Sequence, residues 1–169
     1  AYRLLDIAKG VGVDAVKIQT YTADSLTIDC KKPDFVITDP LWKGKRYYQL
    51  YQEITMPRSW NKKLFDRARK LDLTLFSSPF DEASVDLLED LNCPAYKIAS
   101  FEAKDHAFIQ KVAATAKPII MSTGISNIRD IQESIEVARD AGCQDIAVLH
   151  CVSCYPSDVT DMNIEALRE

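Results

Sequence analysis

The sequence predicts an α/β fold of the (β/α)8 TIM-type barrel class. Short apolar runs of strand length alternate with amphipathic helical segments, and the later runs recur roughly every 25 residues. This alternation is typical of parallel strands joined by helical crossovers. Because the chain has neither a G-x-G-x-x-G nor a Walker loop, and polar residues follow every run, we favour a barrel over a doubly wound sheet.

Five strands and four main helices are expected along the chain. The strands are expected at 14–19, 73–78, 95–100, 118–123 and 146–153, and the helices near 61–71, 82–91, 105–116 and 127–141. For the last helix, Asn127 is the expected N-cap and Gly142 marks the expected end. The apolar side of this helix is assigned to Ile128, Ile131, Ile135 and Val137.

The two ends of the chain predict an incomplete barrel. Residues 1–10 begin inside a helical pattern and residues 163–169 stop abruptly. Five strands cannot close an eight-stranded barrel. We therefore expect a single incomplete barrel domain over residues 1–169, with its first and last strands missing.

The segment 21–60 interrupts the regular order of elements. It is long for a connection within a compact domain, and such segments are usually functional or disordered. Its aromatic content argues against disorder, and a helix is expected at about 44–54. Two interpretations stay open: a lid packed on the barrel rim by its own aromatics, or a segment that touches substrate. The aromatic residues concerned are Trp42, Tyr47, Tyr48, Tyr51 and Trp60.

Composition excludes several classes of function. The chain is 47% hydrophobic and 27% charged, as in ordinary globular proteins. A net charge of −4 argues against general binding of nucleic acid or anionic membranes, so any anion site must be local. No apolar run approaches the roughly 20 residues of a membrane span, and no signal peptide is visible. Five scattered cysteines suit a reducing cytoplasm, which is the expected location.

Two lysines stand in the middle of expected strands. Side chains alternate along a strand, so Lys17 shares a face with Ala15 and Gln19, opposite Val16 and Ile18. By the same alternation, Lys97 shares a face with Ala95 and Ala99. We expect both lysines to face the barrel axis, near each other and near Ser122. A lysine in that position needs an anion, which is either a barrel carboxylate or a ligand.

Hydroxyl groups add donors on the same face. Ser78, Ser122 and Ser153 come at strand ends with the inward alternation. Ammonium and hydroxyl groups at the C-terminal mouth suit a carboxylate or phosphate, and barrel enzymes bind substrate at that mouth. Glu102 follows the third expected strand closely and is either an acid or base of the site or a solvated loop residue.

A metal reading of His150-Cys151-x-x-Cys154 is not favoured. Residues 151 and 154 fall on opposite faces of one strand, so their side chains cannot bind the same metal ion. His150 is expected to be a hydrogen-bonded histidine in the helix layer, and His106 to be exposed at a helix start. We expect no metal site made wholly by this chain.

Around the strand lysines and the strand-end serines, the sequence resembles the sialic acid (nonulosonic acid) synthase family. The similarity spans nearly the whole chain in the family's order, and the series of blocks is far more specific than any single motif. Residues 31–37, 41–45 and 48–53 resemble the members that make pseudaminic acid. The shared blocks are 14–20 (DAVKIQT), 76–80 (FSSPF), 94–102 (PAYKIASFE), 117–124 (KPIIMSTG) and 149–156 (LHCVSCYP).

The resemblance implies a site for phosphoenolpyruvate (PEP). It assigns Glu102 and Tyr155 to the sugar side, and catalytic roles to Lys17, Lys97 and Glu102. In many relatives the position of Ser78 is Thr, and that of Ser153 is Asn in N-acetylneuraminate synthases, which leaves the role of Ser153 less secure. The implied PEP-binding residues are Lys17, Gln19, Ser78, Lys97, Ser100, Ser122 and Ser153.

The resemblance also implies the reaction and its other components. PEP condenses with an acetamido-deoxy hexose to give a nine-carbon nonulosonic acid and phosphate, with a divalent metal, Mn or Mg, as Lewis acid. The metal ligands of the family lie beyond residue 169, as does its antifreeze-like domain. No organic cofactor is implied, the complete protein is expected to be a homodimer, and the 169 residues alone are expected to be inactive.

Alternatives remain at this point. One is synthesis of N-acetylneuraminic or legionaminic acid. Another is a Schiff-base aldolase, since a barrel lysine can form an imine with a carbonyl substrate. The last is a non-catalytic barrel remnant or subunit.

Overall fold

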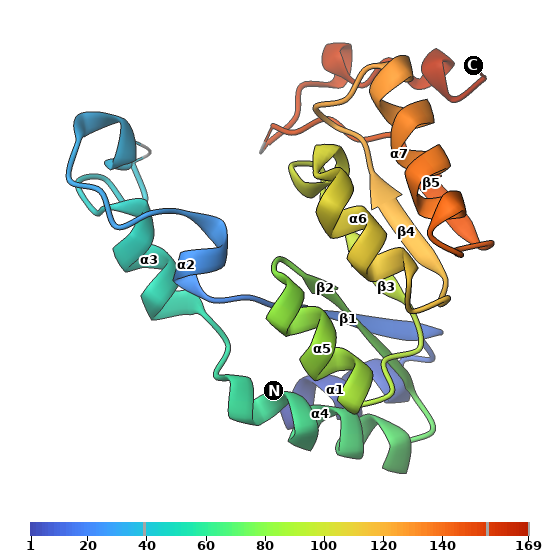
Figure 1. The fold of residues 1–169 in the computed structure, drawn as a ribbon. Helices are drawn as coiled ribbons and strands as arrows, with labels where there is room; N and C mark the ends of the chain where they lie inside the picture. Colours follow the sequence, from blue (N-terminus) through green and yellow to red (C-terminus); the bar gives the residue numbers. More distant parts are fainter. Residues whose placement is uncertain (39, 155, 169) are drawn as a thin grey trace.

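The computed structural model of the chain describes residues 1–38, 40–154 and 156–168. Five parallel strands form one sheet in which neighbours in space are also consecutive in sequence. The sheet confirms the predicted class, with strands and helices in the arrangement of a partial (β/α)8 barrel (Figure 1). The strands are β1 (Ala15–Thr20), β2 (Thr74–Pro79), β3 (Tyr96–Ile98), β4 (Ile119–Ser122) and β5 (Ile146–Leu149).

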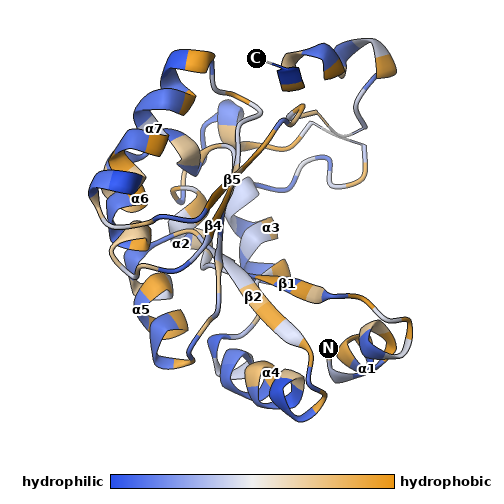
Figure 2. Cartoon of the chain, turned by 90° about the vertical axis from the view of Figure 1, so that its right-hand side faces the viewer, coloured by the Kyte–Doolittle hydropathy of each residue, from blue (hydrophilic) through white to orange (hydrophobic). Residues whose placement is uncertain are grey.

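Helices cover one face of this sheet. Viewed along the sheet, they form an arc around the strands and leave the opposite face open (Figure 2). The helices that contact one another are neighbours in chain order, as in other barrels built from βα units. The covering helices are α1 (Tyr2–Gly10), α4 (Arg58–Lys70), α5 (Glu82–Asp90), α6 (His106–Ala113) and α7 (Ile128–Asp140).

The hydrophobic core lies between the sheet and the helices. Alternate strand residues such as Leu75, Ile98 and Met121 are buried against apolar side chains of the helices. The partners on the helices include Leu88 of α5 and Ile109 of α6, both fully buried. Since the bulky residues of each strand point to this core, the residues between them face the open side of the sheet.

The last strand is shorter than the sequence predicted. The expected strand 146–153 ends at Leu149, which pairs with Ser122, the last residue of β4. After Ser122 the neighbouring chain turns at Gly124, so residues beyond Leu149 have no strand beside them to continue the ladder. Residues 150–154 therefore form a loop at the C-terminal end of the sheet.

Helix α7 has its expected ends but not its expected apolar side. The Asn127 side chain accepts a hydrogen bond from the Asp130 amide at 3.0 Å, and Gly142 follows with φ +106°. The fully buried residues are Ser134 and Ala138, whereas Ile128 is 51% exposed. The assignment of Ile128, Ile131, Ile135 and Val137 to one side was wrong, because residues nine apart lie about half a turn apart at about 100° per residue.

The segment after β1 forms an arm, residues 21–57, that stands away from the sheet (Figure 1). It contains α2 (Ala23–Leu26), a short 3-10 helix (Pro33–Phe35) and α3 (Tyr47–Ile54). Tyr47 stacks on Tyr51 at 6.3 Å between ring centroids, and the Tyr48 hydroxyl donates to Asp24 at 2.9 Å. These contacts hold the arm together. At its base, Tyr21 packs edge-on against Phe80 at 5.6 Å between ring centroids. Both interpretations of the segment, a lid on the rim and a contact with substrate, stay predictions.

A buried polar network fixes the root of the arm to the sheet. Thr20, the last residue of β1, bonds to Asn61 in the first turns of α4 at 3.0 Å and to the Ser77 hydroxyl at 2.8 Å. All three residues are nearly inaccessible to solvent. Because Thr20 precedes the arm and Asn61 follows it, the network ties the two ends of the arm together.

Candidate anion site

The two strand lysines lie on the open, concave face of the sheet. On β1 the more covered residues are Val16, Ile18 and Thr20, so Lys17 and Gln19 point to the other side. On β3, Lys97 lies between the fully buried Tyr96 and Ile98 and pairs in register with Ile120. The structure thus agrees with the alternation argument for both strands.

Lys97 is held at the C-terminal end of the sheet by two hydrogen bonds. Its ammonium group donates to the Ser122 hydroxyl across the neighbouring strand, and to the Ile98 carbonyl oxygen at 2.8 Å. Burial lowers its pKa, and the positive charge of Lys17 lowers it further. Cys151 and Glu102 act in the opposite direction. The charge of Lys17 thus acts on Lys97, while direct proximity of the two ammonium groups stays a prediction.

Neither lysine has a carboxylate partner among the described residues. No ion pair in that part of the chain includes Lys17 or Lys97, although twelve other pairs form between surface groups such as Lys104 and Asp130. Lys17 is more exposed than Lys97, yet burial also lowers its pKa. Two uncompensated ammonium groups on one concave face favour an anionic ligand over an internal ion pair.

Three further hydroxyl groups lie at or just beyond the C-terminal ends of β2, β3 and β5. Ser78 is buried at the end of β2 and pairs in register with Gln19. Ser100 follows β3, and its hydroxyl accepts a hydrogen bond from the Gly124 amide at 3.2 Å. Ser153 lies on the same loop cluster, because a Cβ built on Gly124 would overlap its hydroxyl.

Glu102 begins a 3-10 helix (Glu102–Lys104) directly after β3. One of its carboxylate oxygens, Oε2, is buried and has no hydrogen-bond partner among the described residues. Burial raises the pKa of this carboxyl, while its own backbone amide and the charge of Lys97 act against the rise. An unpartnered buried carboxyl oxygen beside a lysine is a candidate for proton transfer.

The histidines and the second loop cysteine lie outside this site. His106 is exposed at the start of α6, as expected. His150 is exposed and not in the core, and its Nε2 lies 2.8 Å from the Met162 carbonyl oxygen. The expected hydrogen bond is present, but the expected burial is wrong because residues 150–154 leave the sheet. Cys154 is exposed, and its thiol donates a hydrogen bond to the Pro156 carbonyl oxygen at 3.4 Å.

Sequence reasoning missed two residues of the site, Cys151 and Gly124. The Cys151 thiol lies 3.4 Å from the Ser122 hydroxyl. Cys151 stands two residues before Ser153, so strand alternation places both on the same face and could have indicated Cys151. A thiol, however, carries no charge that would make it unusual in a strand, as the lysines are. Gly124 is recognisable only from the close approach of the loops after β3, β4 and β5. Tyr155, expected on the sugar side, lies outside the described residues.

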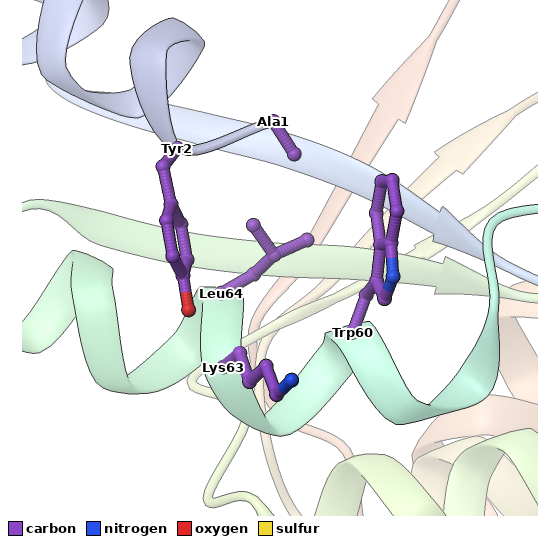
Figure 3. Close-up of a pocket in the computed structure, with 5 residues that line it drawn as sticks. All are labelled: Ala1, Tyr2, Trp60, Lys63 and Leu64. Atoms are coloured by element: carbon purple, nitrogen blue, oxygen red, sulfur yellow. The ribbon is translucent and has the colours of Figure 1, made fainter.

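Other hollows of the surface are distinct from this site. A cavity of about 280 Å³ lies between the start of α1 and α4, with Tyr2, Leu64 and Trp60 side by side (Figure 3). Trp60 thus belongs to α4 and not to the arm. The described residues include no group of three or more His, Cys, Asp or Glu that could hold a metal ion. No helix of that part of the chain has the length and apolarity that a membrane span requires.

The structure describes a barrel-type α/β protein with a candidate anion site at the C-terminal ends of its strands. Comparison with known proteins agrees with the fold. The model of the NeuB family matches residues 4–169, so the chain belongs to the NeuB family.

Similar proteins include two curated relatives and one solved structure. Pseudaminic acid synthase of Helicobacter pylori is 47% identical over 160 residues, which are 95% of this chain and 47% of the relative. That of Campylobacter jejuni serotype O:2 is 39% identical over 167 residues, 99% and 49% of the two lengths. The chain spans about half the length of these relatives. N-acetylneuraminic acid synthetase of Leptospira borgpetersenii shares the fold, with a TM-score of 0.84 at 22% identity over 99% of this chain and 53% of that one.

Proposed function

We propose that the protein containing this chain is a nonulosonic acid synthase that joins PEP to an acetamido sugar and releases phosphate. The product proposed is pseudaminic acid, after the two relatives of that name. One observation carries the proposal. Lys17 and Lys97 face one concave surface, without a carboxylate partner among the described residues, and hydroxyl donors lie beside them. A ligand with two anionic groups fits that set of donors.

The lysines and serines would bind the carboxylate and phosphate of PEP. Lys97 has one proton left after its two internal hydrogen bonds, and the ammonium group of Lys17 has no hydrogen-bond partner among the described residues. The Lys97 ammonium group, held by two hydrogen bonds before the ligand arrives, would lose little freedom on binding. The positive charges of the two lysines would stabilise the negative charge that builds up on the phosphate as it leaves.

The reaction balances without an oxidant or reductant. Carbon C3 of PEP forms a bond to the aldehyde carbon of the open-chain sugar, and the aldehyde oxygen takes a proton. Water adds to C2 and loses one proton, which balances the proton taken by the aldehyde oxygen. The C2–O bond to phosphate then breaks while the hydroxyl at C2 passes its proton to the leaving phosphate, which leaves a ketone at C2. Glu102, whose raised pKa favours the protonated form relative to an exposed glutamate, would move a proton on the sugar side.

The described site residues do not fit a divalent cation. Mg²⁺ and Mn²⁺ prefer several oxygen ligands with carboxylates among them, whereas this site offers two ammonium groups and a single carboxyl. The metal that the family resemblance implies is therefore not assigned to these residues, and no step given to them passes through it.

A Schiff-base aldolase is the second candidate function. The observation in its favour is the lowered pKa of Lys97, caused by burial and by Lys17, because a neutral amine is the form that attacks a carbonyl. Borohydride reduction in the presence of pyruvate distinguishes the two functions. A stable adduct on Lys97 supports the aldolase, and its absence together with turnover of PEP supports the synthase.

The direct test is phosphate release by the protein expressed from its full reading frame. PEP and a 6-deoxy diacetamido hexose should give phosphate and a nine-carbon acid in equal amounts, as measured by a phosphate assay and mass spectrometry. Formation of phosphate without the acid, or no reaction with any acetamido hexose, would refute the proposed function.

A further inference from the structure

The loop after β5 places a thiol against the Lys97–Ser122 pair. Cys151 is partly buried, and its sulfur lies 3.4 Å from Ser122 Oγ and 3.5 Å from the Leu149 carbonyl oxygen. Cys151 thus contacts the hydroxyl of Ser122, to which Lys97 also donates.

Counting bonds at Ser122 shows what this thiol does. A serine hydroxyl has one proton to donate and two positions at which it can accept. Lys97 can only donate, so its bond occupies one accepting position, and the single proton of the Cys151 thiol, shared with the Leu149 carbonyl oxygen, is directed into the other. The remaining proton of Ser122 is then directed away from both donors, and it is available for a ligand.

A neighbouring hydroxyl is arranged in a similar way. Ser100 Oγ accepts a bond from the Gly124 amide at 3.2 Å, so its proton is likewise left for another acceptor. Both accepting positions of Ser122 and one of Ser100 are taken by the protein, so each hydroxyl has its proton left for a ligand. Such donors favour ligand groups that only accept hydrogen bonds, such as carboxylate and phosphate oxygens, and disfavour an amide in the same place.

We propose that Cys151 is a positioning residue for PEP binding, which acts through Ser122. The inference rests on the proposed function for the identity of the ligand. Its geometric basis is the three-membered arrangement of Lys97, Ser122 and Cys151. The thiol keeps the Ser122 hydroxyl from turning its proton toward the loop, and so keeps it as a donor to the anion.

The test compares four variants of the protein from its full reading frame. Cys151→Ala should raise the KM for PEP about three- to tenfold, the effect expected from one neutral hydrogen bond, and should leave the KM for the sugar unchanged. Cys151→Ser should restore part of the loss, because a hydroxyl donates like a thiol but reaches less far. Cys154→Ala, an exposed thiol on the same loop, is the matched control and should behave as wild type.

The fourth variant combines Cys151→Ala with Ser122→Ala, and Ser122→Ala alone is its reference. If Cys151 acts through Ser122, removing the thiol should add no further loss of PEP affinity in the Ser122→Ala background. An additive loss there, or equal rises in KM for both substrates, would overturn the inference. Direct PEP binding by calorimetry on the same variants keeps the two proposals separable. If PEP binds in the predicted order of affinities but is not turned over, the proposed function fails and the positioning role stands.

Discussion

Replacement of Lys97 by methionine tests the anion site most directly. Methionine keeps most of the apolar stem that passes between the strands and removes the ammonium group. Lys97 donates to the Ser122 hydroxyl and to the Ile98 carbonyl oxygen, and it faces the concave side of the sheet with one proton free. The variant should therefore bind PEP weakly and remain folded.

The magnitude follows from the kind of bond that is lost. A hydrogen bond to a charged group contributes about 1.5–3 kcal/mol, which corresponds to a loss of affinity of about 10- to 150-fold. The upper end is expected, because Ser122 loses the donor that orders its hydroxyl. Stability should change by less than about 1 kcal/mol, since removal of a partly buried charge offsets the loss of two internal hydrogen bonds.

Calorimetric titration with PEP and urea denaturation of the same preparations would measure both effects. The matched control is Lys104→Met, which removes the same charge close to the site from a lysine that pairs with Asp130 at 2.9 Å. It should leave PEP affinity within about twofold of wild type, since surface pairs contribute little. Equal losses of affinity in the two variants would mean that overall charge, and not the position of Lys97, attracts the ligand. An unfolded Lys97→Met variant would refute the argument that this lysine is retained for a ligand.

Four further predictions concern the loops, the carboxyl, the core and the sugar. Gly124→Ala should raise the KM for PEP, because the added Cβ would overlap the Ser153 hydroxyl, and such overpacking costs about 1–3 kcal/mol. An unchanged KM together with an unchanged melting temperature would contradict this prediction. Burial raises the pKa of Glu102 in the folded state above its usual 4.5. At a pH between the unfolded and the folded pKa, the folded state therefore binds more protons than the unfolded chain. The stability of the fold should fall as pH rises through that range. In urea denaturation, Glu102→Gln should therefore gain stability relative to wild type as pH increases from about 4, and a constant difference would argue against burial of this carboxyl. Glu89→Ala should destabilise the fold by about 1–3 kcal/mol, since it removes the acceptor of the buried Tyr96 hydroxyl, whereas Glu89→Gln should cost less. In competition between the 6-deoxy diacetamido hexose and N-acetylmannosamine, the former should be preferred by up to about 10- to 200-fold, the range for one methylene-sized difference in an apolar pocket; a tenfold preference for N-acetylmannosamine would refute the choice of sugar and leave the family unaffected.

The sequence predicted the sheet because the signals for it are local. Alternation of apolar residues with Lys17 and Lys97 specifies which face of each strand is covered, and a strand has only two faces. The helix ends at Asn127 and Gly142 follow from capping and from positive φ, which also depend on a few neighbouring residues. For the same reason, both lysines could be assigned to the concave face before any coordinates were known.

Tertiary structure decided the features that depend on several segments at once. The loop after β5 leaves the sheet because β4 ends at Ser122, opposite Leu149, so His150 is exposed where alternation alone placed it in the helix layer. Aromatic residues of the arm gave no sign of their partners, since stacking within the arm and packing on the rim need the same residue types. The contacts of Cys151 with Ser122, and of Gly124 with Ser100, join segments more than twenty residues apart. A pattern along one strand carries no information on such distances, which only the packing of neighbouring loops determines.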